Sequence, residues 1–236
     1  MQSNNHGPIL VDGECYPSVS KILASDPKKK SFYKSRGLKK RTRSPGSSET
    51  VEAGRIRGRS LHECFSDYIT TGEADVPPLY YEHWAQLHEL ISSFDITDLQ
   101  WAERPLAPEH SKFQQGDTAV IYSKKSKYLG KPDLIASLGG VPCIWEIKTS
   151  NDLYSKNYDY TKFISYSSFL PYCHAALQVG AYRKAWAECT GQQIDTGIII
   201  NVTKNDSQLF IVERPELLSR QKSFTKLAKD YHAKAS

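Results

Sequence analysis

Residues 130–149 read Gly-Lys-Pro-Asp-Leu-Ile-Ala-Ser-Leu-Gly-Gly-Val-Pro-Cys-Ile-Trp-Glu-Ile-Lys-Thr, a pattern that predicts two β-strands joined by a tight turn. The Gly139-Gly140 dipeptide is typical of a two-residue hairpin turn. In such a hairpin residue 138 pairs with residue 141, and the same register sets Asp133 opposite Glu146. We therefore expect these two carboxylates to share one face of the hairpin.

Strand alternation extends this face to Lys148 and turns the apolar neighbours to the other face, namely Leu134, Ala136, Trp145 and Ile147. Directly opposed residues have Cβ atoms about 4.5–5.5 Å apart, and like charges there need neutralisation. A divalent cation such as Mg²⁺ or Mn²⁺ would supply it, and a lysine beside metal-bound water can orient that water toward a phosphodiester. The alternative is an ordinary hairpin with a surface salt bridge.

Asp133 followed by Glu146-x-Lys148 on the next strand resembles the PD-(D/E)XK nuclease superfamily. Residues 58–62 (Gly-Arg-Ser-Leu-His) and the Gln178-x-x-x-Tyr182 pattern resemble further motifs of its RecB-type branch. Residues 16–23, 145–150 and 177–182 are similar to the mitochondrial genome maintenance exonuclease group, and the resemblance covers most of residues 14–212. It implies an α/β fold with a central mixed β-sheet flanked by helices, in a phage or bacterial relative of that group.

The resemblance also implies several metal ligands beyond Asp133 and Glu146. His62 would bind the metal from a helix, although a histidine hydrogen-bonded at a helix–sheet interface is the alternative. The backbone carbonyl of Ile147 would be a further ligand. Glu103 would lie on the strand before the hairpin, with Asp117 as a competing carboxylate.

Gln178 and Tyr182 are four residues apart on an expected helix, so their side chains project from one face. Such a pair can hold a phosphate oxygen or orient the lysine and its water. An ordinary amphipathic helix with a half-buried Tyr182 is the alternative.

Positive charge is concentrated in residues 28–43, which contain nine Lys or Arg and no acid in a chain of net charge +5, so the other residues together carry −4. Such a segment can contact phosphates while Phe32 and Tyr33 stack on unpaired bases. A solvated basic loop is the alternative. The DNA-binding residues expected here and on the next helix are Lys28, Lys29, Lys30, Lys34, Arg36, Lys39, Lys40, Arg41 and Arg57.

The 236 residues are enough for one domain, with residues 1–50 as an N-terminal basic segment packed on or extending from a nuclease core at 51–236. No apolar run has the length of a membrane span and the first residues lack signal-peptide features, so we expect a cytoplasmic protein. Five dispersed cysteines predict neither disulfides nor the iron–sulfur cluster of some RecB-type relatives.

Periodicity predicts the order of elements. A short turn and helix start at 11–24, capped by Ser18 or Ser20, precede helices at 50–71 and 78–94. Strands follow at 99–106, 117–122, 131–138 and 141–148, then a helix at 171–190, a hairpin at 196–202 and 208–213, and a helix at 215–233. This order is typical of an α/β sandwich.

We therefore expect a Mg²⁺- or Mn²⁺-dependent exonuclease that acts on single-stranded DNA from free ends, in replication, recombination or repair. A structure-selective or single-strand endonuclease, a non-catalytic nucleic-acid-binding module and an RNA-processing enzyme are the alternatives. The end requirement comes from the resemblance alone.

Overall fold

The computed structural model describes residues 10–11, 13–27, 51–102, 114–115, 118–157 and 165–234. At its centre lies a five-stranded sheet in the order β11-β10-β9-β8-β3. Its strands are β3 (Ile96–Ala102), β8 (Leu134–Leu138), β9 (Val141–Thr149), β10 (Thr196–Val202) and β11 (Ser207–Val212). Because β9 and β10 run parallel while the other neighbours run antiparallel, the sheet is mixed, and the expected α/β class is confirmed.

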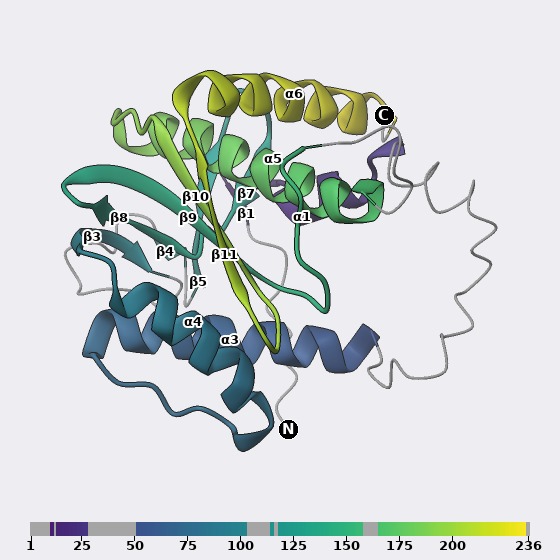
Figure 1. Cartoon of the computed structure of the whole chain (residues 1–236). Coiled ribbons are helices and arrows are strands. Elements are labelled where there is room, and N and C mark those ends of the chain that lie inside the picture. The colour runs from purple at the N-terminus through teal and green to yellow at the C-terminus, as the bar shows by residue number, and fades with distance from the viewer. Residues whose placement is uncertain are drawn as a thin grey trace.

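Helices cover both faces of this sheet (Figure 1). Helices α5 (Ser165–Thr190) and α6 (Arg214–Ala233) pack on one face, and α3 (Val51–Thr71) and α4 (Tyr81–Ser92) on the other. Alternate residues of β9 enter different cores: Ile144 packs with residues of α5, whereas Trp145 packs with residues of α3 and α4. A strand buried on both faces explains the nearly continuous apolar run in this part of the sequence.

The N-terminal part of the described chain packs on the helices over the first face. Helix α1 (Val19–Ala24) contacts α5 and α6. The Ser18 side chain caps α1 by accepting a hydrogen bond of 3.1 Å from the Lys21 N–H, so the expected cap at Ser18 is confirmed. Short strand pairs lie around the sheet: β1 (Leu10–Val11) with β2 (Glu14–Cys15), β4 (Gln114–Gln115) with β5 (Thr118–Ala119), and β6 (Ile121–Ser123) with β7 (Tyr128–Gly130).

Most predicted elements are present, with differences at their ends. A 3₁₀ turn at Pro78–Tyr80 starts the second helix, and β3 begins three residues earlier than expected. The expected start of the next helix at residue 171 was wrong, because α5 begins at Ser165. Pro171 has no N–H to donate within the helix, but the buried Leu170 and Tyr172 anchor this turn on the core.

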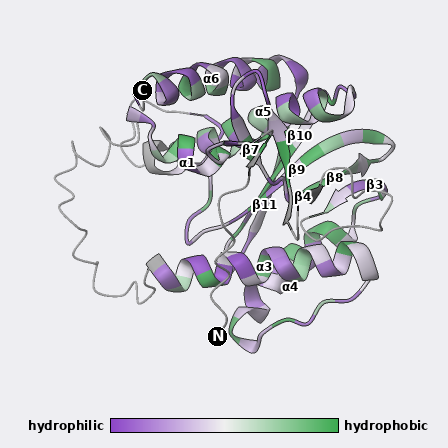
Figure 2. Ribbon diagram, turned by 180° about the vertical axis from the view of Figure 1, so that it is seen from behind, coloured by the Kyte–Doolittle hydropathy of each residue, from purple (hydrophilic) through white to green (hydrophobic). Residues whose placement is uncertain are grey.

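Hydrophobic residues are concentrated on β8, β9 and β10 (Figure 2). Among the helices in the described part of the chain, none is both long and apolar enough to cross a membrane.

Candidate active site

The β8–β9 hairpin has the register that the glycine turn predicts. Leu138 pairs with Val141, and each following pair keeps the same offset as far as Leu134 and Trp145. Gly139 and Gly140 have φ angles of +55° and +78°, which fit a type I′ turn and favour glycine at both positions.

Asp133 lies one residue before β8, so the expected strand start at residue 131 was wrong. Pro132 precedes it and has no N–H with which to continue the ladder. In place of a further backbone rung, the Asp133 Oδ2 accepts a hydrogen bond of 2.6 Å from the Ile147 N–H. The carboxylate is therefore fixed to β9 at the point where β8 begins.

Beyond Trp145, the described ladder of β9 continues only with β10. Glu146 pairs with Ile199 and Lys148 with Asn201 on that side. Since Ile135 and Ile144 belong to the core under α5, alternation sets Asp133, Glu146 and Lys148 toward the same side of the sheet. Among the described residues, the last residues of β9 thus have a strand neighbour on one edge only.

The Glu146 carboxylate is buried and only half satisfied. Its side chain is 3% exposed, and its Oε1 accepts a hydrogen bond from the Lys148 ammonium. Its Oε2 has no hydrogen-bond partner among the residues that the structure describes. A buried carboxylate oxygen without a partner is costly, so this atom is a candidate for binding a cation.

Burial dominates the electrostatics of Glu146. Burial raises the pKa of Glu146 from its ordinary 4.5 to about 7, and the Asp133 charge adds to the rise while Lys148 and His62 oppose it. Burial alone would lower the pKa of Lys148, but the negative charges of Glu146 and Asp133 outweigh it and raise that pKa. Lys148 is therefore an ammonium at neutral pH, with a side chain that is 26% exposed.

Helix α3 brings His62 to the same site. The His62 Nδ1 lies 2.8 Å from the Asp133 Oδ1, so both oxygens of Asp133 have partners. The helix passes close to the end of β9 at Gly58, where an added Cβ would lie 3.4 Å from the Thr149 Oγ1. His62, Asp133, Glu146 and Lys148 thus come together, whereas direct binding of a metal by His62 stays a prediction.

Other expected site residues have different surroundings. Arg57 is buried on α3 and donates a hydrogen bond of 3.2 Å to the Asn151 Oδ1, so its predicted contact with DNA stays a prediction. Glu103 and Asp117 lie outside the described residues. The same is true of eight basic residues that we expected to bind DNA: Lys28, Lys29, Lys30, Lys34, Arg36, Lys39, Lys40 and Arg41.

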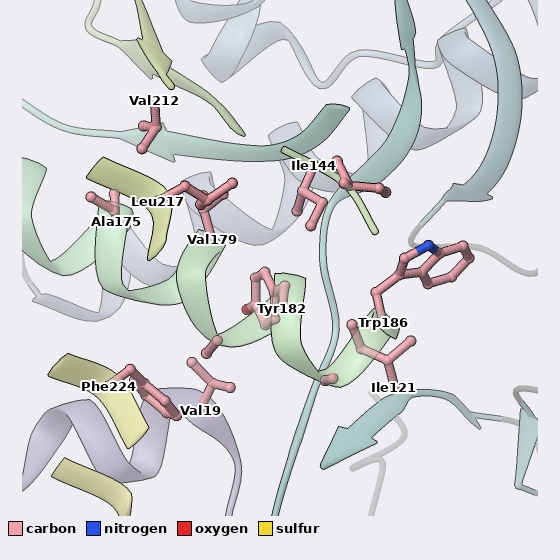
Figure 3. Close-up of a cluster of buried hydrophobic side chains, with 14 of the residues drawn as sticks. Val19, Ile121, Ile144, Ala175, Val179, Tyr182, Trp186, Val212, Leu217 and Phe224 are labelled. Carbon is pink, nitrogen blue, oxygen red and sulfur yellow. The ribbon is translucent and has the colours of Figure 1, made fainter. Parts of the chain in front are cut away.

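Gln178 and Tyr182 share one face of α5 as expected, and the Gln178 Nε2 lies 3.4 Å from the Tyr182 hydroxyl oxygen. The Tyr182 ring belongs to the core between α5 and the sheet (Figure 3). It lies so close to Gly130 that an added Cβ there would be 2.5 Å from a ring carbon. This contact fixes α5 against the chain three residues before Asp133; a role in holding phosphate stays a prediction.

Sequence reasoning missed Asn201, which is fully buried on β10 beside Lys148. A signal was present, because this amide follows Ile198, Ile199 and Ile200 in an otherwise apolar strand. A buried polar side chain in such a run needs hydrogen-bond partners, and in an enzyme these often support a site.

The donor set fits Mg²⁺ or Mn²⁺ held by few protein ligands. Asp133 and Glu146 offer carboxylate oxygens, and Mg²⁺ commonly binds one or two carboxylates and keeps several waters. Across the part of the chain that the structure describes, no three side chains of His, Cys, Asp or Glu are arranged as a metal site. The observation that favours a cation here is the Glu146 Oε2, which lacks a hydrogen-bond partner within the described part of the chain.

Fold and site together define an α/β protein with two carboxylates and a lysine at the end of a central hairpin. No protein-family model matches the sequence, and the comparison with curated proteins gives no match.

Proposed function

We propose that this protein is a metal-dependent deoxyribonuclease that hydrolyses phosphodiester bonds, with single-stranded DNA attacked from free ends as its substrate. The observation that carries the proposal is the buried Glu146 Oε2, which has no hydrogen-bond partner among the described residues and lies beside a lysine ammonium and a second carboxylate. A structural salt bridge alone would leave no reason to bury this second oxygen, because desolvating it without a partner destabilises the fold.

The residues of the site have separate tasks in this proposal. Asp133 and Glu146 would hold Mg²⁺ or Mn²⁺, and the ion would acidify bound water and offset charge on the phosphate. The Lys148 ammonium, which stays protonated beside the carboxylates, orients the attacking water and attracts the phosphate. His62 holds Asp133 through its Oδ1 while the Ile147 N–H holds the Oδ2, so the carboxylate cannot rotate freely.

The choice of DNA and of free ends rests on the sequence resemblance and on the charge distribution. The basic residues at 28–43 would bind phosphates without reading sequence. The proposed setting is the cytoplasm of a bacterium or of a phage-infected host, where replication, recombination and repair produce single-stranded ends.

The test compares an end-labelled linear single strand with a covalently closed circle of the same sequence, incubated with Mn²⁺, Mg²⁺ or EDTA. Wild type, Lys148→Ala and the control Lys127→Ala are assayed in parallel. Lys127 is suitable because its exposed ammonium pairs with Glu14 on the surface. We expect metal-dependent loss of the linear strand alone, abolished by Lys148→Ala and unaffected by Lys127→Ala.

Cutting of the circle would replace the exonuclease by an endonuclease with an open groove. Cutting of RNA but not DNA of the same sequence would change the substrate class. Binding of DNA without cleavage under any metal condition would refute the nuclease and leave a nucleic-acid-binding module.

A further inference from the structure

The chain that follows Lys148 is anchored to the sheet by side chains. We call residues 150–157 the anchored segment. Its first residue donates a backbone hydrogen bond of 2.9 Å from the Ser150 N–H to the Val202 carbonyl, and the Ser150 Oγ donates one of 2.8 Å to the Asn201 Oδ1. The segment therefore leaves β9 in a fixed direction.

Asn201 connects this segment with two strands. It stands level with Lys148 in the parallel ladder between β9 and β10. Its Nδ2 lies 3.2 Å from the Asp152 carbonyl and 3.2 Å from the Gln208 Oε1. Together with the bond from the Ser150 Oγ to the Asn201 Oδ1, these contacts satisfy both the oxygen and the nitrogen of a completely buried amide.

Gln208 on β11 then holds the backbone of Tyr154. The Tyr154 N–H donates to the Gln208 Oε1 at 2.6 Å, and the Gln208 Nε2 donates to the Tyr154 carbonyl at 3.2 Å. The amide thus binds both backbone groups, as a neighbouring strand would. Tyr154 is held by a side chain from β11, which Asn201 in turn supports.

Tyr154 is held over the face of the sheet from which Lys148 projects, because Gln208 is level with Asn201, and Asn201 with Lys148, in the strand ladders. Its ring is half-buried and packs against the core that contains Tyr172 and Val179. Burial raises the pKa of the Tyr154 hydroxyl, while the charge of Lys148 lowers it and that of Glu146 raises it, so the group lies within the field of both.

We infer that the Tyr154 hydroxyl donates a hydrogen bond to a non-bridging phosphate oxygen of the substrate beside Lys148, and that Asn201 and Gln208 are the positioning residues that hold it there. The phosphate has oxygens with full acceptor capacity, and the phenol supplies a neutral donor where Lys148 supplies charge. This inference rests on the proposed nuclease function. It adds a contacting residue and identifies what fixes it.

The first experiment removes the hydroxyl alone. Tyr154→Phe keeps the ring and its packing. Tyr68→Phe is the control because Tyr68 of α3 packs against Trp84 and His88 of α4. We expect Tyr154→Phe to lower kcat roughly 10- to 100-fold, as for a hydrogen bond to a charged group, with a smaller change in KM. Tyr68→Phe should change neither.

The second experiment separates positioning from general stability. In Gln208→Leu, the Tyr154 amide should exchange its hydrogen faster than in wild type, because its acceptor is gone. The kcat should fall as well. In the double variant Tyr154→Phe/Gln208→Leu, the second substitution should add little to the first, because Gln208 acts through Tyr154.

A third measurement keeps the inference testable if the protein does not cleave DNA. Binding of fluorescein-labelled oligothymidylate in Ca²⁺ is followed by anisotropy for wild type and Tyr154→Phe. Weaker binding by Tyr154→Phe without cleavage by either protein would support the phosphate contact and refute the nuclease. Normal cleavage and normal binding by Tyr154→Phe would overturn the inference and leave the nuclease intact. Wild type that neither binds nor cleaves would overturn both.

Discussion

Replacing Glu146 by glutamine should make the metal-free protein more tolerant of alkaline pH while abolishing activity. The change keeps the size of the side chain and removes its buried negative charge. Because the pKa of Glu146 is raised to about 7 from 4.5, the folded state binds this proton more tightly than the unfolded state. The stability that this group contributes is therefore complete below pH 4.5 and is lost as pH rises through 7.

The size of the effect follows from the same values. Between pH 5.5 and pH 8, a shift from 4.5 to about 7 makes the free energy of unfolding of wild type fall by about 2 kcal/mol through this group. Glu146→Gln has no such proton, so this contribution to the pH dependence should vanish. The loss of the Lys148 partner offsets part of the gain at pH 8, but not the change in slope.

The assay is urea unfolding in EDTA at pH 5.5 and pH 8 for wild type, Glu146→Gln and the control Glu89→Gln. Glu89 is exposed on α4, so its variant should keep the wild-type pH dependence. The free energy of unfolding could instead fall equally between pH 5.5 and pH 8 in wild type and Glu146→Gln, or fall more in the variant. Either result would refute the reasoning that the folded state disfavours the charged form of Glu146.

Three further changes test neighbouring parts of the site. Asp133→Ala should lower the free energy of unfolding by about 1–3 kcal/mol, measured in urea, because the buried Ile147 N–H loses its acceptor; an unchanged midpoint would contradict this. Gly130→Ala should destabilise by about 1–3 kcal/mol in the same assay, because the new Cβ would meet the Tyr182 ring at 2.5 Å. Mn²⁺ should raise the melting temperature of wild type, because free Mn²⁺ at 100 times its Kd stabilises the folded state by about 2.7 kcal/mol. It should not raise the melting temperature of Glu146→Ala, and equal shifts in the two proteins would place the ion elsewhere.

The hairpin register was predictable because local chemistry determines it. Gly139 and Gly140 allow one tight turn, and that turn fixes each following strand pair as far as Leu134 and Trp145. The faces of Trp145 and Glu146 follow from alternation alone. The chemistry that converges on the end of β9 is thus encoded within twenty residues.

What the sequence could not show depends on contacts between distant segments. That His62 reaches Asp133 requires α3 to cross the hairpin, and no local pattern sets that crossing. Arg57 reads as a surface cation on a helix, but α3 packs so that it meets Asn151 and is buried. That the Glu146 Oε2 has no hydrogen-bond partner among the described residues likewise depends on packing between distant segments, which periodicity does not report.

The late start of β8 has a consequence for how such a protein can change over generations. Pro132 and Asp133 stop the strand before it would cover the last residues of β9, and the sheet forgoes backbone rungs there. Selection for stability alone would favour strand-forming residues at both positions, and each such replacement would extend the sheet. A lineage relieved of the need for catalysis would therefore be expected to keep this fold and to lengthen β8 along the edge of β9 beside Glu146, so that the length of one strand would record whether the site was still in use.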